Sequence, residues 1–170
     1  MMTSWILAAV VLAGAAADWR TRRIPNWLTL PAMTLGLIVN ALDGRFTTAI
    51  MGLVVALGVY FAFFALGFRG AGDGKLMGVV GAFLGWPDVA TVIALVALLG
   101  GLAALAVAMR YGALSRVVGS VGVIFADLLR CRWSELRARC NYRAPGALRM
   151  PHGPVIAAGT LVFLLFAPRS

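Results

Sequence analysis

The chain has 170 residues, of which 62% are hydrophobic and only 12% are charged, and its mean hydropathy is +0.94. Soluble domains carry about 25% charged residues. The apolar residues stand in long blocks, without the alternation over roughly ten residues that is typical of membrane β-strands. The composition therefore excludes an ordinary soluble domain and predicts an all-α, polytopic membrane protein.

Six apolar segments follow one another along the chain, and we interpret them as six membrane spans of one domain covering residues 1–170. A helix needs about 20 apolar residues to cross a 30 Å hydrocarbon core. The first, second and fourth segments are short by this measure. The expected spans are 2–17, 28–42, 46–67, 74–86, 89–109 and 151–167.

The positive charges predict the orientation of these spans. Cytoplasmic loops of membrane proteins carry an excess of Lys and Arg. With the N-terminus outside, only Arg45 and Arg169 of the 15 Lys and Arg residues lie outside. We therefore expect both termini outside. The net charge of +9 is explained by topology, and no nucleic-acid partner is expected. The first span has no preceding Lys or Arg, so it is expected to be a retained helix rather than a cleaved signal peptide.

Residues 110–150 form the one long segment between spans, and they are rich in Arg. Apolar residues recur at helical spacing in its first half. This pattern resembles an interfacial helix on anionic lipid headgroups, and a docking surface for a partner is the alternative. The stripe consists of Leu114, Val117, Val118, Val121, Phe125, Leu128 and Leu129.

Four of the six acidic residues have a local explanation. Asp43 precedes Gly44 in a tight turn, and Asp88 follows Pro87 and is expected to cap the fifth span. Asp127 and Glu135 lie in the basic segment, where solvated pairing with Arg suffices.

Asp18 and Asp73 are different, because each stands at the end of a short apolar segment. Met1 to Asp18 as a helix spans roughly 25 Å, and the fourth segment about 20 Å, so neither crosses the core. Both carboxylates are expected below the cytoplasmic surface at similar depth, where acidic side chains are usually functional. Gly70, Gly72 and Gly74 are expected to allow unusual backbone angles around Asp73.

Gly78, Gly81 and Gly85 follow on the same short segment. Small residues let membrane helices approach each other closely. We therefore expect these glycines to serve helix packing.

Two carboxylates at one depth favour aspartic-protease chemistry, in which the pair holds one proton. A proton-coupled transporter with an Asp18–Asp73 relay and a non-catalytic scaffold are the alternatives. No metal site or cofactor is expected, because Cys131 and Cys140, separated by eight residues, do not suit a zinc site. His152 is left open as a site residue.

Three motifs together resemble the type IV prepilin peptidase family. "GAGDGKL" contains the G-x-G-D signature of intramembrane aspartyl proteases, "DWRTRRIPNWLTL" resembles D-x-R-x-x-x-I-P-N-x-L, and "LRMPHGPVIAAG" resembles the P-x-G-P segment. The chain is most similar to the short, Flp/Tad-type branch. It has no insert with two Cys-x-x-Cys pairs, which the longer, methylating members carry, so methyltransferase activity is not expected.

The resemblance implies an aspartic endopeptidase of the bacterial inner membrane, with Asp18 and Asp73 as the catalytic pair on the cytoplasmic side. The implied substrate is a prepilin, a basic leader followed by an apolar helix, and pilus-assembly proteins are possible partners. Motif residues that would support the site are Arg20, Ile24, Pro25, Asn26, Gly70, Gly72, Gly74, Lys75, Pro151, His152, Gly153 and Pro154.

Overall fold

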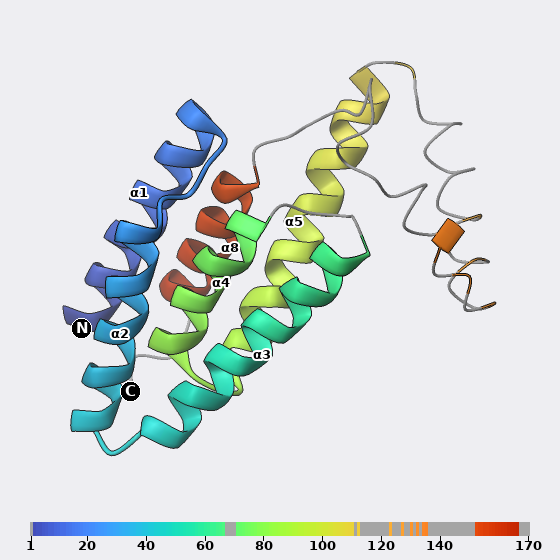
Figure 1. The fold of residues 1–170 in the computed structure, drawn as a ribbon. Helices are drawn as coiled ribbons and strands as arrows, with labels where there is room; N and C mark the ends of the chain where they lie inside the picture. The colour runs from blue at the N-terminus through green and yellow to red at the C-terminus, as the bar shows by residue number, and fades with distance from the viewer. Residues whose placement is uncertain are drawn as a thin grey trace.

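The computed structural model describes residues 2–66, 71–110, 112, 123, 127, 130, 132, 134–135 and 152–166. These residues form six α-helices and no strand (Figure 1), so the all-α prediction is confirmed. Each of the six segments expected to be a span contains a helix, while the crossing of a membrane and its direction stay predictions. The helices are α1 (Met2–Thr21), α2 (Asn26–Leu42), α3 (Phe46–Ala65), α4 (Ala71–Leu84), α5 (Asp88–Arg110) and α8 (Gly153–Phe166).

Two helices extend beyond the apolar segments that predicted them. Helix α1 continues past Asp18 to Thr21, and α4 begins at Ala71, before Asp73. Gly72 and Gly74 are therefore helical, and the expectation of unusual backbone angles at these two glycines is wrong. Gly70 lies outside the described residues.

Helix α4 is the centre of the bundle. It contacts α1, α2, α3, α5 and α8, and Figure 1 shows it between the α1–α2 pair and the α3–α5 pair. Every residue from Leu76 to Phe83 is buried. A helix that is apolar on all sides is stable only when other helices cover it. The short fourth segment is thus a core helix, and Asp73 stands in its first turn.

Glycines bring α3 and α4 into backbone contact. A Cβ atom at Gly52 would lie 2.6 Å from the Cα atom of Gly85, and one at Gly81 would collide with the carbonyl oxygen of Gly52. A Cβ atom at Gly78 would lie 2.7 Å from the Cε atom of Met33 on α2. The predicted packing role of Gly78, Gly81 and Gly85 is confirmed, with Gly52 as their partner on α3.

The periphery of the bundle is apolar. On α3 three of the four buried residues are small, namely Ala49, Gly52 and Ala56, and the fourth is Tyr60, whereas Val54 and Phe61 are exposed. Helices α3 and α5 are long and apolar enough to cross a membrane, and α2 and α8 are shorter apolar helices. Large apolar side chains on the outside of the bundle suit a lipid environment rather than water.

The remaining acidic residues agree with expectation in part. Asp43 and Gly44 form the turn after α2, with Gly44 at φ +69°, and Asp88 is the first residue of α5. Glu135 forms an exposed ion pair with Arg132 at 3.3 Å. Asp127 is buried, so the expectation of a solvated carboxylate is wrong there. The protein encloses this side chain, which the polar composition of its segment could not indicate. The apolar stripe expected in residues 110–150 lies outside the described residues.

Candidate active site

Asp18 lies on α1 against the first turn of α8. Its side chain is buried, and its Oδ2 atom accepts a hydrogen bond of 2.8 Å from the backbone N–H of Gly153. Gly153 is the first residue of α8, where the backbone N–H groups have no partner within the helix. A carboxylate at this end also interacts favourably with the helix dipole. The hydrogen bond therefore orients the Asp18 side chain and also gives a partner to one of the free N–H groups at the start of α8.

The contact with Asp18 leaves no room for a side chain at residue 153. A Cβ atom on Gly153 would lie 2.8 Å from the Cβ atom and 3.0 Å from the Oδ2 atom of Asp18, and 3.3 Å from the Cα atom of Ala15. Pro154, the next residue, has no N–H group and adds no unsatisfied donor. The glycine and the second proline of the P-H-G-P segment thus have a physical role at Asp18.

His152 begins this turn of the chain. Its carbonyl oxygen accepts the N–H groups of Val155 and Ile156 at 3.0 and 3.1 Å, which starts α8. The Nε2 atom of its ring is enclosed, and it has no hydrogen-bond partner among the residues that the structure describes. Pro151 lies outside those residues.

Asp73 lies in the first turn of α4 and is half-buried. Helix α4 packs against α1, and the two helices run in opposite directions (Figure 1). The two helices touch at Gly14, where a Cβ atom would lie 2.7 Å from the Cδ1 atom of Leu76. This contact fixes the register of the two helices.

The register brings the two carboxylates to one level. Asp18 follows Gly14 by four residues, about 6 Å along α1, and Asp73 precedes Leu76 by three, about 4.5 Å along α4. Both steps lead toward the same end of the bundle. Residues three or four apart lie on one helix face, so both aspartates stand on the faces by which α1 and α4 meet. The expectation of similar depth is thereby supported by geometry.

The other motif residues surround this pair. The Nζ atom of Lys75 donates a hydrogen bond of 2.6 Å to the Oδ1 atom of Asn26, which ties α4 to the start of α2. Ile24 is buried, and a Cβ atom on Gly72 would lie 3.7 Å from it. Pro25 precedes α2 in an extended conformation and serves as its N-cap residue.

Two further motif residues lie at the edge of the site. Arg20 is exposed on the last turn of α1. Gly74 faces Tyr60 of α3, whose Cβ atom lies 3.3 Å from the position of an added Cβ. Gly74 thus places the start of α4 against α3, as Lys75 ties it to α2.

Gly14 and Ala15 were not recognised as site residues from the sequence, although both determine how Asp18 is placed. The signal was the run of small residues "AGAAAD" before Asp18, which allows α4 and α8 to approach α1 closely. Within the described part of the chain, no three His, Cys, Asp or Glu side chains group in a way that could hold a metal ion.

The protein is thus an all-helical bundle with two acidic side chains on facing helices at one end. Residues 5–105 match the type IV leader peptidase family (Peptidase_A24), and the chain belongs to that family. The matched region includes Asp18 and Asp73, and it ends before the segment that holds Gly153.

The chain is similar to proteins named prepilin leader peptidase/N-methyltransferase. One from Burkholderia pseudomallei (strain 1026b) is 29% identical over 170 residues, which cover 94% of this chain and 45% of that protein. One from Escherichia coli (strain K12) is 36% identical over 101 residues, 54% of this chain and 44% of that protein. The chain thus spans less than half the length of these curated relatives. No solved structure matches the chain.

Proposed function

We propose that this chain is an aspartic endopeptidase that removes the leader peptide of type IV prepilins of the Flp type. The observation that carries the proposal is the placement of Asp18 and Asp73 at one level on the facing sides of α1 and α4, with Asp18 held by the Gly153 N–H group at 2.8 Å. Membership of the leader peptidase family supports the reaction class.

The proposed reaction uses the two aspartates as one acid–base unit that carries a single proton. The carboxylate takes a proton from a water molecule, and the resulting hydroxide attacks the scissile carbonyl carbon. The carboxylic acid gives its proton to the carbonyl oxygen, which forms a tetrahedral intermediate. The C–N bond then breaks as the leaving nitrogen takes up the proton that came from water. The carbonyl re-forms and returns its hydroxyl proton to the pair.

The proposed orientation places this pair at the cytoplasmic side of the bacterial inner membrane. A prepilin consists of a basic leader followed by an apolar helix, so its scissile bond lies near the membrane surface. With both termini outside, the C-terminal end of α1 and the start of α4 lie at the cytoplasmic side, where such a bond would be. Anionic lipid headgroups would contact the basic loops, since Lys and Arg beside a membrane are attracted to them.

We further propose that the chain cleaves the prepilin but does not methylate the mature pilin. The relatives named above carry both activities in their names. None of the 170 residues forms a Cys-x-x-Cys pair. Mass spectrometry of the mature pilin would test this: an unmethylated N-terminus is expected, and a mass increase of one methyl group would contradict it.

The central experiment is co-expression with a candidate prepilin in a host that lacks its own prepilin peptidase. The wild-type chain is expected to convert the prepilin to a faster-migrating form, and the Asp18→Asn variant is not. A transporter or a scaffold predicts no difference between the two. Equal processing by both proteins would therefore overturn the peptidase assignment.

Labelling of cysteine from each side of the membrane tests the orientation. A membrane-impermeant maleimide should not reach Cys131 in intact cells of a Cys140→Ser variant, and it should react after the membrane is opened. Strong labelling of Cys131 from outside would reverse the topology and remove the cytoplasmic site.

A further inference from the structure

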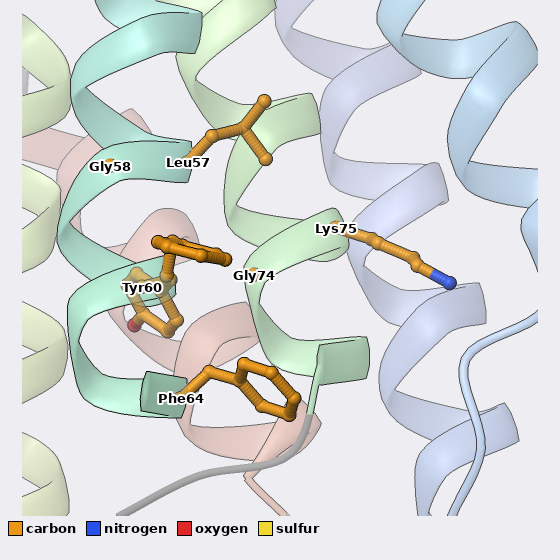
Figure 2. Close-up of a pocket in the computed structure, with 7 residues that line it drawn as sticks. Leu57, Gly58, Tyr60, Phe64, Gly74 and Lys75 are labelled. Carbon is orange, nitrogen blue, oxygen red and sulfur yellow. The ribbon is translucent and has the colours of Figure 1, made fainter. Parts of the chain in front are cut away.

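Beside Asp73 the bundle has an apolar groove that the catalytic pair does not use. The groove lies between the second half of α3 and the first turn of α4 and encloses about 550 Å³. Its walls are Leu57, Gly58, Tyr60, Phe61 and Phe64 on α3 and Gly74 and Lys75 on α4. Figure 2 shows the rings of Tyr60 and Phe64 beside the start of α4. Its volume lies within the range of about 300–1,000 Å³ that is common for ligand sites.

The groove lies at the level of the candidate active site. Gly74 and Lys75, which form its α4 wall, are the two residues that follow Asp73 in the same helical turn. Successive residues of a helix point about 100° apart, so the groove opens on the α3 side of α4, and a peptide beside Asp73 would pass around the start of α4 to enter it. This shared level separates the groove from the rest of the apolar periphery.

The lining of the groove suits an apolar occupant. The one cation on its rim, Lys75, is directed away from it: Figure 2 shows the side chain extending from α4 to the side opposite α3, where its Nζ atom bonds to Asn26 at 2.6 Å. The remaining wall consists of aromatic and aliphatic side chains and two glycines. A basic leader would find no carboxylate in this groove, whereas an apolar helix would lose no hydrogen bond by entering it.

Gly58 gives the groove its open side. A Cβ atom added there would meet no atom within 4 Å, although the residue lies in the middle of an aromatic wall. Within a membrane, helices associate by close packing, and small residues permit the backbones to approach. Gly58 thus leaves room for a second helix at the point where the groove faces outward.

From these observations we infer that the groove is the docking site for the apolar helix of the substrate, immediately after the scissile bond. The inference rests on the proposed function, which supplies a substrate whose apolar helix follows the cleaved leader. The peptide bond would lie at Asp18 and Asp73, and the first turns of the helix would pack between Tyr60, Phe64 and Gly58. A lipid acyl chain is the other occupant of matching chemistry, and the experiments below distinguish it.

A Gly58→Leu variant fills the groove without disturbing the bundle, because its side chain enters open space. Gly101→Leu on α5 is the matched control, since a Cβ atom there also meets nothing within 4 Å. Kinetics with full-length prepilin in nanodiscs should show KM raised about tenfold or more by Gly58→Leu, with kcat within about twofold, and no change for Gly101→Leu. Unchanged KM for Gly58→Leu, with an active wild type, would overturn the docking site and leave the proposed function standing. An inactive wild type would instead overturn the proposed function.

Disulfide crosslinking tests the same contact without cleavage. In an Asp73→Asn, Cys131→Ser, Cys140→Ser background, Gly58→Cys should crosslink to a prepilin with a single cysteine in the first two turns of its apolar helix. Gly101→Cys should not. Equal crosslinking from both positions, or none from position 58, would contradict docking in the groove.

Discussion

Two buried polar side chains, Asp18 and Asn40, stand at opposite ends of the bundle and show two uses of polarity inside an apolar protein. The Nδ2 group of Asn40 contacts three carbonyl oxygens, those of Gly36, Ala82 and Phe83, at 3.0–3.1 Å. Ala82 and Phe83 belong to the last turn of α4, whose carbonyls have no partner within the helix. Asn40 therefore caps α4 from a neighbouring helix, and the N–H donors of its side chain serve to hold the fold together.

Asp18 is held differently. Among the described residues, its side chain accepts one hydrogen bond, from the N–H group of Gly153, and Asp18 lies about one helical turn from the contact between Gly14 and Leu76 of α4. A carboxylate has two oxygens and about four lone-pair sites. One hydrogen bond is enough to orient it, and the remaining capacity is available for water and substrate. The comparison teaches that burial alone does not mark a catalytic group; what matters is how much of its hydrogen-bonding capacity the fold uses.

The largest expected effect is at the acidic pair. Asp18→Asn and Asp73→Asn should each lower prepilin cleavage by at least about 10³-fold, because an amide keeps the size of the side chain but cannot cycle a proton. The two residues act as one unit, so the double variant should be no worse than either single variant. Membrane fractionation provides the control that the variants accumulate. Near-normal turnover by Asp73→Asn would contradict the catalytic role of Asp73 and would favour a residue that marks the membrane surface or relays protons in a transporter.

The second prediction concerns the contact that holds Asp18. Gly153→Ala should lower kcat by about 10- to 100-fold. The added Cβ atom would lie 2.8 Å from the Cβ atom of Asp18, so the Asp18 side chain must move away from its position. Gly159→Ala on the same helix is the control: its Cβ atom would lie 2.6 Å from the Cγ2 atom of Val96 and would not touch Asp18. That variant should lose stability but keep its activity per folded molecule. Equal loss of kcat in both variants would show that α8 acts only through stability.

The opposite end of the bundle should show the reverse behaviour. Asn40→Leu should destabilise the protein by about 1–3 kcal/mol, since it removes a buried donor from the carbonyls of Ala82 and Phe83. Activity per folded molecule should remain. Thermal unfolding in detergent measures the loss. Thr160→Val should cost less, because Thr160 bonds at 2.8 Å only to the carbonyl of Ile156 in its own helix.

The smallest effects are expected at the acidic residues with purely local roles. Asp43→Asn and Asp88→Asn should keep cleavage within about twofold, because one stands in a turn and the other in the first turn of α5. The mobility of a co-expressed prepilin is a sufficient assay. An inactive Asp88→Asn protein that still accumulates in the membrane would mean that the acidic pair was chosen wrongly.

The sequence by itself determined the helical class and the six helical segments to within a few residues, and it led to the prediction of Asp18 and Asp73 as the acidic pair. These follow from local properties: apolar blocks of helical length, the positions of charges, and a carboxylate at the end of a segment too short to cross a membrane. The sequence also indicated which glycines serve packing.

Only the tertiary structure decided the rest. The central place of α4, the register of Gly14 against Leu76 and the hydrogen bond from Gly153 to Asp18 join residues up to 135 positions apart. Contacts of this kind depend on which helix faces meet, and a periodic pattern does not specify that. The ends of α1 and α4 also differed from expectation: α1 continues through the exposed residues 19–21, and α4 begins at Ala71, before Asp73. Asn40 shows the same limit, since its place in the sequence gives no sign of the carbonyls that it caps.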